Sequence, residues 1–323
     1  MIKSIYSSLL ILCMGILPSY TLAAAYQPTK SVTLIVPFPP GGGTDRFARI
    51  LGLKLSDMWG QTVVVENRSG AQGSIGTAHV AKAAPDGYTL LVAHQGVFAV
   101  NPHLYKDTGF DPFKDFVPVA RATQQPFVLV VNDTLPVKTL KELVTLAKSE
   151  PGQINFGSAT SGAQLAGELL KHNAGIDMLS IAYKGAAPGV VDVLGGHINL
   201  MVATPPSIAQ HVKDGKLRAL VLFGSERISA IPDAPTAAEA GYPALGDMPE
   251  WYGIVVPAGT PANLVVQMNQ DINVALQDPD LQRRAQAQGL IPAPTTPEKF
   301  AAQIRRDYDS WGEIVKKMGL KAQ

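Results

Sequence analysis

Short runs of apolar and β-branched residues alternate along the chain with longer stretches in which apolar residues recur every three or four positions. A continuous apolar run is typical of a strand covered on both faces, and a spacing of three or four is typical of a helix. The apolar runs predict strands at 33–36, 62–67, 88–93, 127–132, 154–158, 179–183, 198–203, 217–223 and 251–257.

The helical spacing is clearest behind the first strand. The apolar residues that share one face there are Phe47, Ile50, Leu51, Leu55 and Met58. Capping boxes at 139–142 and 236–239 mark two further helix starts. Other helices are expected at 74–84, 162–173, 186–195, from 204–207 onward, and at 261–277, 279–288 and 297–318. The segment 101–115 is rich in Pro, Gly and aromatic residues, and we expect a loop there.

This βα alternation predicts parallel sheets with helices on both faces. The length of 323 residues suggests about two domains. Two strand runs, 127–132 and 251–257, flank a self-contained βα block, so the chain is expected to leave a first lobe and return to it. We therefore predict lobe 1 from 26–125 and 254–323 and lobe 2 from 126–253, with two crossing strands as a hinge and a cleft between the lobes.

The turn after the first strand carries three prolines and three glycines, from Pro37 to Gly43. Thr44 or Asp45 can cap the helix that follows. Free backbone N–H groups at a helix N-terminus form a site for an anion, and the alternative is a turn that binds no ligand. The turn is not a nucleotide-binding loop, because no Lys follows Gly43 and Arg46 stands where the dinucleotide pattern needs Gly.

Other predicted strands also end in polar or glycine-rich loops, at 68–76, 94–96 and 158–162. Ligands of open α/β sheets bind outside the carboxyl ends of the strands. We therefore expect these loops to share one binding region.

The first 25 residues are typical of a secretory signal peptide. Lys3 is their only charge, an apolar core follows, and small residues precede an expected cleavage between Ala23 and Tyr26. The only cysteine, Cys13, would leave with the signal, and 26 basic residues (27 − 1) would then face 26 acidic ones. This balance suggests no nucleic-acid partner, and we expect an exported monomer in the periplasm.

Motifs for catalysis or metal binding are lacking. The six histidines include no pair at i and i+4 on one helix, and no serine lies in a Gly-x-Ser-x-Gly elbow. We therefore assign no catalytic residue, no metal ligand and no cofactor.

Taken together, the motifs resemble those of the Bug family, the periplasmic solute-binding proteins of tripartite tricarboxylate transporters. The motifs that carry the resemblance, in order, are Val36-Pro-Phe-Pro-Pro-Gly-Gly-Gly-Thr-Asp45, Val65-Glu-Asn-Arg-Ser-Gly-Ala-Gln-Gly-Ser-Ile-Gly-Thr77, Pro85-Asp-Gly-Tyr-Thr-Leu-Leu91, Asn155-Phe-Gly-Ser158, Tyr183-Lys-Gly-Ala-Ala-Pro188 and Leu194-Gly-Gly196. The resemblance covers essentially the whole chain. It implies a type II periplasmic-binding-protein fold, in which two α/β lobes close on a small organic acid.

The resemblance also implies that backbone amides, hydroxyls and waters of the loops hold the carboxylate. The ligand-binding residues it implies are Phe38, Pro39, Gly41, Gly42, Gly43, Thr44, Asp45, Gly70, Ala71, Gln72, His94, Gln95, Ser158, Ala159, Thr160, Ser161, Tyr183, Lys184, Gly185, Ala203 and Thr204. Membrane permease subunits are the implied partners.

The chain departs from the family pattern at positions expected around the ligand. His94 and Gln95 replace the small residues that often follow the third strand, Ala203 and Thr204 replace Asp-Asn, and the loop after Phe156 is longer. Our hypothesis is that His94 or Gln95 contacts the distal end of the ligand. A sensory protein that presents a carboxylate to a receptor, or a secreted α/β hydrolase, are the alternatives to a transport protein.

Overall fold

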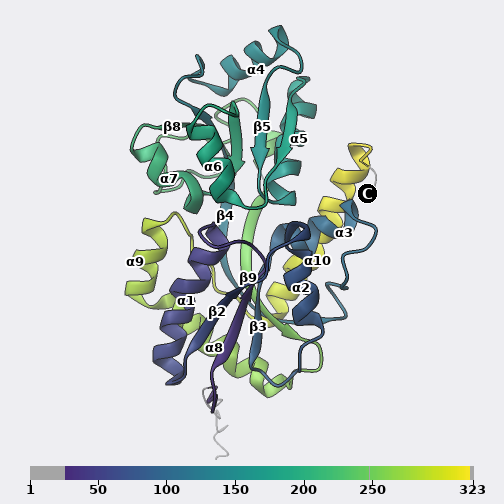
Figure 1. Ribbon diagram of the computed structural model, residues 1–323, viewed down its shortest axis with the longest axis vertical. Helices are drawn as coiled ribbons and strands as arrows, with labels where there is room; N and C mark the ends of the chain where they lie inside the picture. The colour runs from purple at the N-terminus through teal and green to yellow at the C-terminus, as the bar shows by residue number, and fades with distance from the viewer. Residues whose placement is uncertain (1–25, 247, 321–323) are drawn as a thin grey trace, which may run out of the picture.

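The computed structural model describes residues 26–246 and 248–320, so the expected signal peptide at 1–25 lies outside the described residues. Figure 1 shows two lobes, one above the other, joined by long strands that run between them. The predicted two-lobed α/β fold with a hinge of two crossing strands is therefore confirmed. Within the described ranges, none of the helices combines the length and the apolar character that crossing a membrane would require.

Lobe 1 is built on a sheet with the strand order β2-β1-β3-β9-β4. Strands β1, β2 and β3 are parallel, whereas β9 runs antiparallel to both β3 and β4. These strands are β1 (Val32–Val36), β2 (Val63–Asn67), β3 (Thr89–His94), β4 (Phe116–Asn132) and β9 (Pro249–Pro257). The helices of this half are α1 (Gly43–Trp59), α2 (Ser74–Ala81), α3 (Asn101–Leu104), α8 (Ala262–Gln277), α9 (Pro279–Ala287) and α10 (Pro297–Lys317), with the short turns η1 (Ala71–Gly73) and η2 (Gly96–Val100).

Lobe 2 continues from the far end of β4, where β7 and β8 pair with it antiparallel and β5 and β6 extend the sheet in parallel. Its strands are β5 (Asn155–Ser158), β6 (Leu179–Ala182), β7 (Leu200–Ala203) and β8 (Leu217–Phe223). Its helices are α4 (Leu140–Ser149), α5 (Ser161–Ala174), α6 (Ala186–Leu194) and α7 (Pro205–Lys213), and η3 (Pro243–Leu245) precedes β9. Thr139 and Glu142 form the predicted capping box at the start of α4.

The strand predicted at 127–132 is the second half of β4, a strand of 17 residues. Residues from Phe116 to Pro126 pair with β9, and those from Phe127 onward pair with β8. The sequence pattern missed the first half because polar residues such as Gln124 and Gln125 interrupt the apolar run. This strand and β9 together form the connection between the lobes.

Three other expectations were wrong. The segment 101–115 begins with helix α3, which follows directly on the π-helical turn η2, and only 105–115 lacks helix and strand as expected. The second capping box forms both of its hydrogen bonds, from Thr236 N to Glu239 and from Glu239 N to Thr236, but only a single turn follows. A capping box supplies hydrogen bonds for a helix start, but the chain turns away at Gly241, whose φ of 87° is left-handed.

The third error concerns the start of α1. Its N-cap is Gly42, and neither Thr44 nor Asp45 caps the helix, since both already lie within its first turn. A carboxylate at the third helical position can still accept a hydrogen bond from the backbone just outside the helix. Asp45 does so, accepting from the N–H of Gly41 at 2.9 Å.

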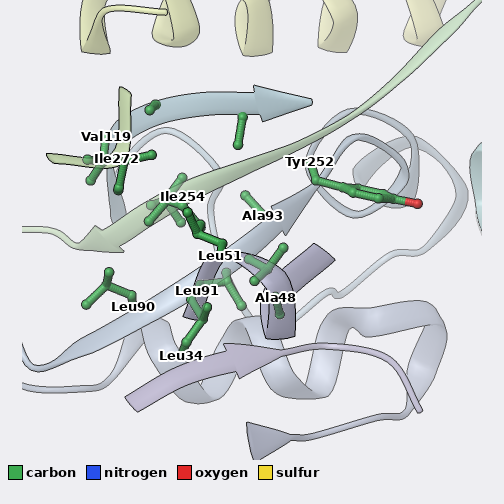
Figure 2. Packing of buried hydrophobic residues seen from close by; sticks show 14 of the residues in the cluster. Leu34, Ala48, Leu51, Leu90, Leu91, Ala93, Val119, Tyr252, Ile254 and Ile272 are labelled. Atoms are coloured by element: carbon green, nitrogen blue, oxygen red, sulfur yellow. The ribbon is translucent and has the colours of Figure 1, made fainter. Parts of the chain in front are cut away.

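Lobe 1 has its own apolar core, in which Leu34, Leu91 and Ile254 are almost fully buried. Figure 2 shows Tyr252 at the border of this core, with its hydroxyl directed away from the labelled apolar side chains. Burial of this kind stabilises a fold by roughly 25 cal/mol per Å² of apolar surface. The core thus holds the aromatic body of Tyr252 rigidly and leaves its hydroxyl at the lobe boundary.

The last helix connects the two halves. Trp311 and Val315 of α10 belong to the apolar cluster of lobe 2, as do Ala99 and Val100 of η2. In Figure 1, α10 runs upward beside α3 toward the level of α5. Side chains from η2 and α10 therefore pack against lobe 2 in addition to the two hinge strands.

Candidate functional site

A cavity of about 40 Å³ lies between the lobes and is lined by residues of both. The lining residues are Phe38, Pro39, Gly42, Gly43, Thr44, His94, Phe127, Ala159, Thr160, Ala163, Gly185, Ala186, Met201, Val202, Ala203, Thr204, Ser207, Glu250 and Tyr252. They come from the carboxyl ends of β1, β3 and β7, from the hinge strands and from the starts of helices. This is the location expected for a ligand of an open α/β sheet.

Four helices begin at this cavity. The N-caps of α1, α5, α6 and α7 are Gly42, Thr160, Gly185 and Thr204, and all four line it. Each helix N-terminus carries roughly half a positive charge and backbone N–H groups without a partner inside the helix. The four ends therefore create a positive potential in the cavity without a positively charged side chain.

The four helix starts differ in what they can donate. Thr160 accepts a hydrogen bond from Ala163 N and so satisfies one N–H of α5, whereas the N-caps of α1 and α6 make no side-chain cap. Helix α7 begins with two prolines, which have no N–H group. Its contribution comes from the dipole and from the hydroxyl of Ser207, which is buried and has no hydrogen-bond partner. Helix α1 thus offers the most backbone donors, because the third residue of α6, Pro188, also has no N–H group.

Tyr252 is the central hydroxyl of the site. It is buried, and its Oη donates to Oε2 of Glu250 at 3.4 Å. Burial, followed by the charge of Glu250, raises the pKa of Tyr252 well above its ordinary value. The hydroxyl therefore stays protonated, and its one hydrogen is directed at Glu250.

The two lobes approach each other closely at two places beside the cavity. A Cβ atom added to Gly43 would lie 2.6 Å from Tyr252 Oη and 3.3 Å from Thr204 Oγ1. A Cβ atom on Gly185 would lie 3.1 Å from Pro39 Cγ. These glycines therefore allow the backbone of each lobe to approach the other closely.

Asp45, which was expected at the ligand, stabilises the loop between β1 and α1. Its carboxylate is buried and accepts hydrogen bonds from Gly41 N at 2.9 Å, Arg49 Nε at 3.1 Å and Asn67 Nδ2 at 3.0 Å. Burial alone would raise the pKa of Asp45, but these bonds outweigh it and lower the pKa below its ordinary value. Asn67 also donates to the carbonyl of Phe38 at 3.0 Å, which ties the loop to β2.

The loop that contains Gly70, Ala71 and Gln72 does not line the cavity. Ala71 and Gln72 adopt left-handed φ angles of 45° and 51°, which are uncommon for residues with a side chain. Asn101 donates to the carbonyl of Gln72 at 3.1 Å and accepts from Ser161 Oγ at 2.5 Å. These predicted residues are thus linked to α5 through Asn101, beside the cavity.

The structure therefore divides the predicted site residues into two sets. The predicted residues that line the cavity are Phe38, Pro39, Gly42, Gly43, Thr44, His94, Ala159, Thr160, Gly185, Ala203 and Thr204. The predicted residues that do not are Gly41, Asp45, Gly70, Ala71, Gln72, Gln95, Ser158, Ser161, Tyr183 and Lys184. A role in ligand binding remains a prediction for both sets.

Several of the second set have other contacts. Tyr183 donates its hydroxyl to Asp192 at 2.7 Å, and burial and this partner raise its pKa to about 12. Lys184 is exposed. Gln95 is buried against Gly162 at the start of α5, so of the two residues in our hypothesis only His94 lines the cavity.

Sequence analysis missed Glu250 and Tyr252, which lie on hinge strand β9. Both are polar-tipped residues in an otherwise apolar strand, and this was the only available signal. It also missed Phe127, Met201 and Ser207. Residues on strands and inside helices leave no loop motif, so only the packing of the two lobes reveals them.

Comparisons with known proteins show the family and the fold of the chain. The family model described as "Tripartite tricarboxylate transporter family receptor" matches residues 47–320. Protein BugT of Bordetella pertussis is 38% identical over 303 residues, which are 93% of this chain and 93% of BugT.

Two solved structures are similar over most of the chain. One, "R. palustris Rpa4515 with adipate", has a TM-score of 0.88 and 31% identity, and covers 92% of this chain and 99% of its own. The other, "MatC (Rpa3494) from Rhodopseudomonas palustris with bound malate", has a TM-score of 0.83 and 31% identity, with 89% and 99% covered. Adipate and malate are both carboxylates.

Proposed function

The chain belongs to the tripartite tricarboxylate transporter receptor family, and on this premise we propose that it captures a small carboxylate and delivers it to a membrane permease. The family resemblance inferred from the sequence motifs is thereby confirmed. The proposal includes a non-catalytic, monomeric protein in the periplasm, with lobes formed by 26–125 with 254–323 and by 126–253.

One observation carries the proposal: the N-caps of four helices line a single cavity between two lobes. A carboxylate needs hydrogen-bond donors and positive potential, and burying it without them is costly. Backbone N–H groups of α1 and α6 and the hydroxyls of Thr44 and Thr204 supply such donors. Related structures with adipate and malate support the same ligand class.

The mode of binding also suits a carrier. Fixed dipoles attract an anion without a formal counter-charge, and the ligand lies where the two lobes meet. Binding would then favour the closed arrangement, and opening of the hinge would release the ligand to a partner. We propose that the permease acts on this opening step.

The test is a thermal-shift screen of the chain from Tyr26 onward, unfolded and refolded first to remove any bound ligand. The panel contains aliphatic mono-, di- and tricarboxylates, amino acids and aromatic acids. A ligand that binds the folded state raises the melting temperature as its concentration increases. At a ligand concentration of one hundred times Kd, the free energy of unfolding increases by about 2.7 kcal/mol. A rise with one class of acids supports capture, whereas no rise with any acid, at millimolar concentration, contradicts it.

Delivery needs a separate experiment. Cells that take up the identified acid are compared with cells in which this gene is deleted and with the deletion strain carrying the gene. Uptake of radiolabelled acid should fall in the deletion strain and return on complementation. Unchanged uptake in the deletion strain would favour the sensory alternative over transport.

A further inference from the structure

Glu250 is a buried carboxylate at the wall of the cavity. It lies on hinge strand β9, its exposed fraction is 0%, and it lines the cavity. Its neighbours are His94, whose Nε2 is 2.9 Å from Oε1, and Tyr252, whose Oη is 3.4 Å from Oε2. A charged group is rarely buried so completely unless it is paired.

His94 does not supply a positive charge to this pair. The N–H of Gly96 donates to Nδ1 of His94 at 3.0 Å, so Nδ1 acts as an acceptor and carries no proton. The only ring hydrogen is then on Nε2, and the imidazole is neutral. His94 packs against Phe38 and Tyr252, which fix the orientation of its ring.

Glu250 also keeps unused hydrogen-bonding capacity. A carboxylate has about four acceptor positions, and the two contacts described occupy at most two. The Nε2–H group of His94 is close to Oε1 but is not aligned with it, so Oε1 lacks a well-directed hydrogen bond. Oε1 of Glu250 is therefore an unused acceptor at the wall of the ligand cavity.

No Lys or Arg is among the residues that line the cavity. The helix N-termini attract anions, but each provides only a partial charge and a carboxylate ligand would use it. A dicarboxylate placed beside Glu250 would add like charge to a buried carboxylate. A cationic nitrogen on the ligand would instead complete an ion pair with a charge-assisted hydrogen bond.

We infer that Glu250 selects ligands that carry a protonated amino group in addition to a carboxylate. The inference rests on the proposed function, because it assumes that the same cavity holds the carboxylate at the helix N-termini. His94 is a positioning residue in this arrangement, since it contacts Glu250 and fixes where the carboxylate lies. The ligand class is a small amino acid in its zwitterionic form.

The test compares acids that differ at one position. Matched sets are propionate with alanine, succinate with malate and aspartate, and glutarate with glutamate, all measured by calorimetry on the refolded chain. We consider the carbon chain whose acids bind most tightly. Within that set, the acid that carries the amino group should bind about 10- to 100-fold more tightly than the acid that has hydrogen at the same position. Malate distinguishes a hydroxyl from an ammonium group.

The wild-type comparison alone can overturn the inference. Equal or tighter binding of the member without the amino group, or of malate over aspartate, would refute a role for a cationic nitrogen and leave carboxylate capture standing. Failure of every acid to bind would overturn both proposals.

The variant Glu250→Gln keeps the shape of the side chain and removes its charge. The preference for the amino member should fall to about onefold, while the member without it binds as before or more tightly. Glu313→Gln, at an exposed position of α10, is the matched control and should keep the wild-type preference. An equal loss for both members of a pair in Glu250→Gln would indicate a structural role and refute the selection.

Discussion

The contact between Gly185 and Pro39 allows the closure of the two lobes to be tested by one added side chain. Gly185 is the N-cap of α6 in lobe 2, and Pro39 lies in the loop after β1 in lobe 1. A Cβ at position 185 would lie 3.1 Å from Cγ and 3.3 Å from Cδ of Pro39. The φ and ψ of Gly185 are 163° and 167°, an extended conformation open to any residue, so a substitution strains no backbone.

The magnitude follows from this spacing. At 3.1 Å an Ala Cβ requires a shift of a few tenths of an ångström, whereas Val adds two methyl groups and requires the lobes to separate. Overpacking of a well-packed contact costs about 1–3 kcal/mol. Because the contact joins the lobes, the cost falls on the closed arrangement alone. The apparent Kd for the bound acid should therefore rise about 5-fold in Gly185→Ala and up to about 150-fold in Gly185→Val.

The assay is calorimetry with the acid found by the thermal-shift screen, together with small-angle scattering of the free and bound protein. Gly195→Ala, at the other end of α6, is the control, because a Cβ there meets His197 at an ordinary 3.4 Å. The melting temperature of the free protein should change little in Gly185→Ala. Wild-type affinity in Gly185→Val, with wild-type compaction on binding, would show that the ligand-bound form does not contain this contact.

Three further predictions follow from the described contacts. Asp45→Asn replaces the charged acceptor of Arg49 with a neutral one, so urea unfolding at pH 7 should show a free energy of unfolding lower by about 1–3 kcal/mol. An unchanged urea midpoint would contradict this. Because the pKa of Asp45 is lowered on folding, its contribution is present above the ordinary value of 3.8 and is lost as pH falls below it, so a plot of stability against pH should be flatter there in Asp45→Asn. Gly253→Ala places a Cβ against Cζ of Phe300 and 2.9 Å from the carbonyl oxygen of Ala120 inside the hinge, and a loss of about 1–3 kcal/mol in the same unfolding experiment is expected; full stability would mean that Phe300 and the strand can adjust to the added group. Tyr252→Phe removes the hydroxyl that donates to Glu250 at the cavity wall and should raise Kd about 5-fold through a loss of roughly 1 kcal/mol, measured by calorimetry, and wild-type affinity would exclude a role of this hydroxyl in binding.

The linear sequence was sufficient for the order of strands and helices and for the presence of loops at the carboxyl ends of strands. Apolar runs and helical spacing are local properties, and most elements formed where these patterns predicted them. The turn from Pro37 to Gly43 was recognised as a helix start for the same reason, since proline and glycine limit the backbone locally. The capping box at 236–239 shows the limit of such signals, because its hydrogen bonds formed but no helix followed.

Only the tertiary structure decided which of these loops form one site. It brought the helix starts at Gly42, Thr160 and Gly185 to one cavity and moved Asp45 and the loop 70–73 into supporting contacts. It also introduced Glu250 from the hinge strand, where no motif marks a binding residue. The physical reason is that a cavity between two lobes depends on contacts between residues far apart in the chain, which local patterns do not specify.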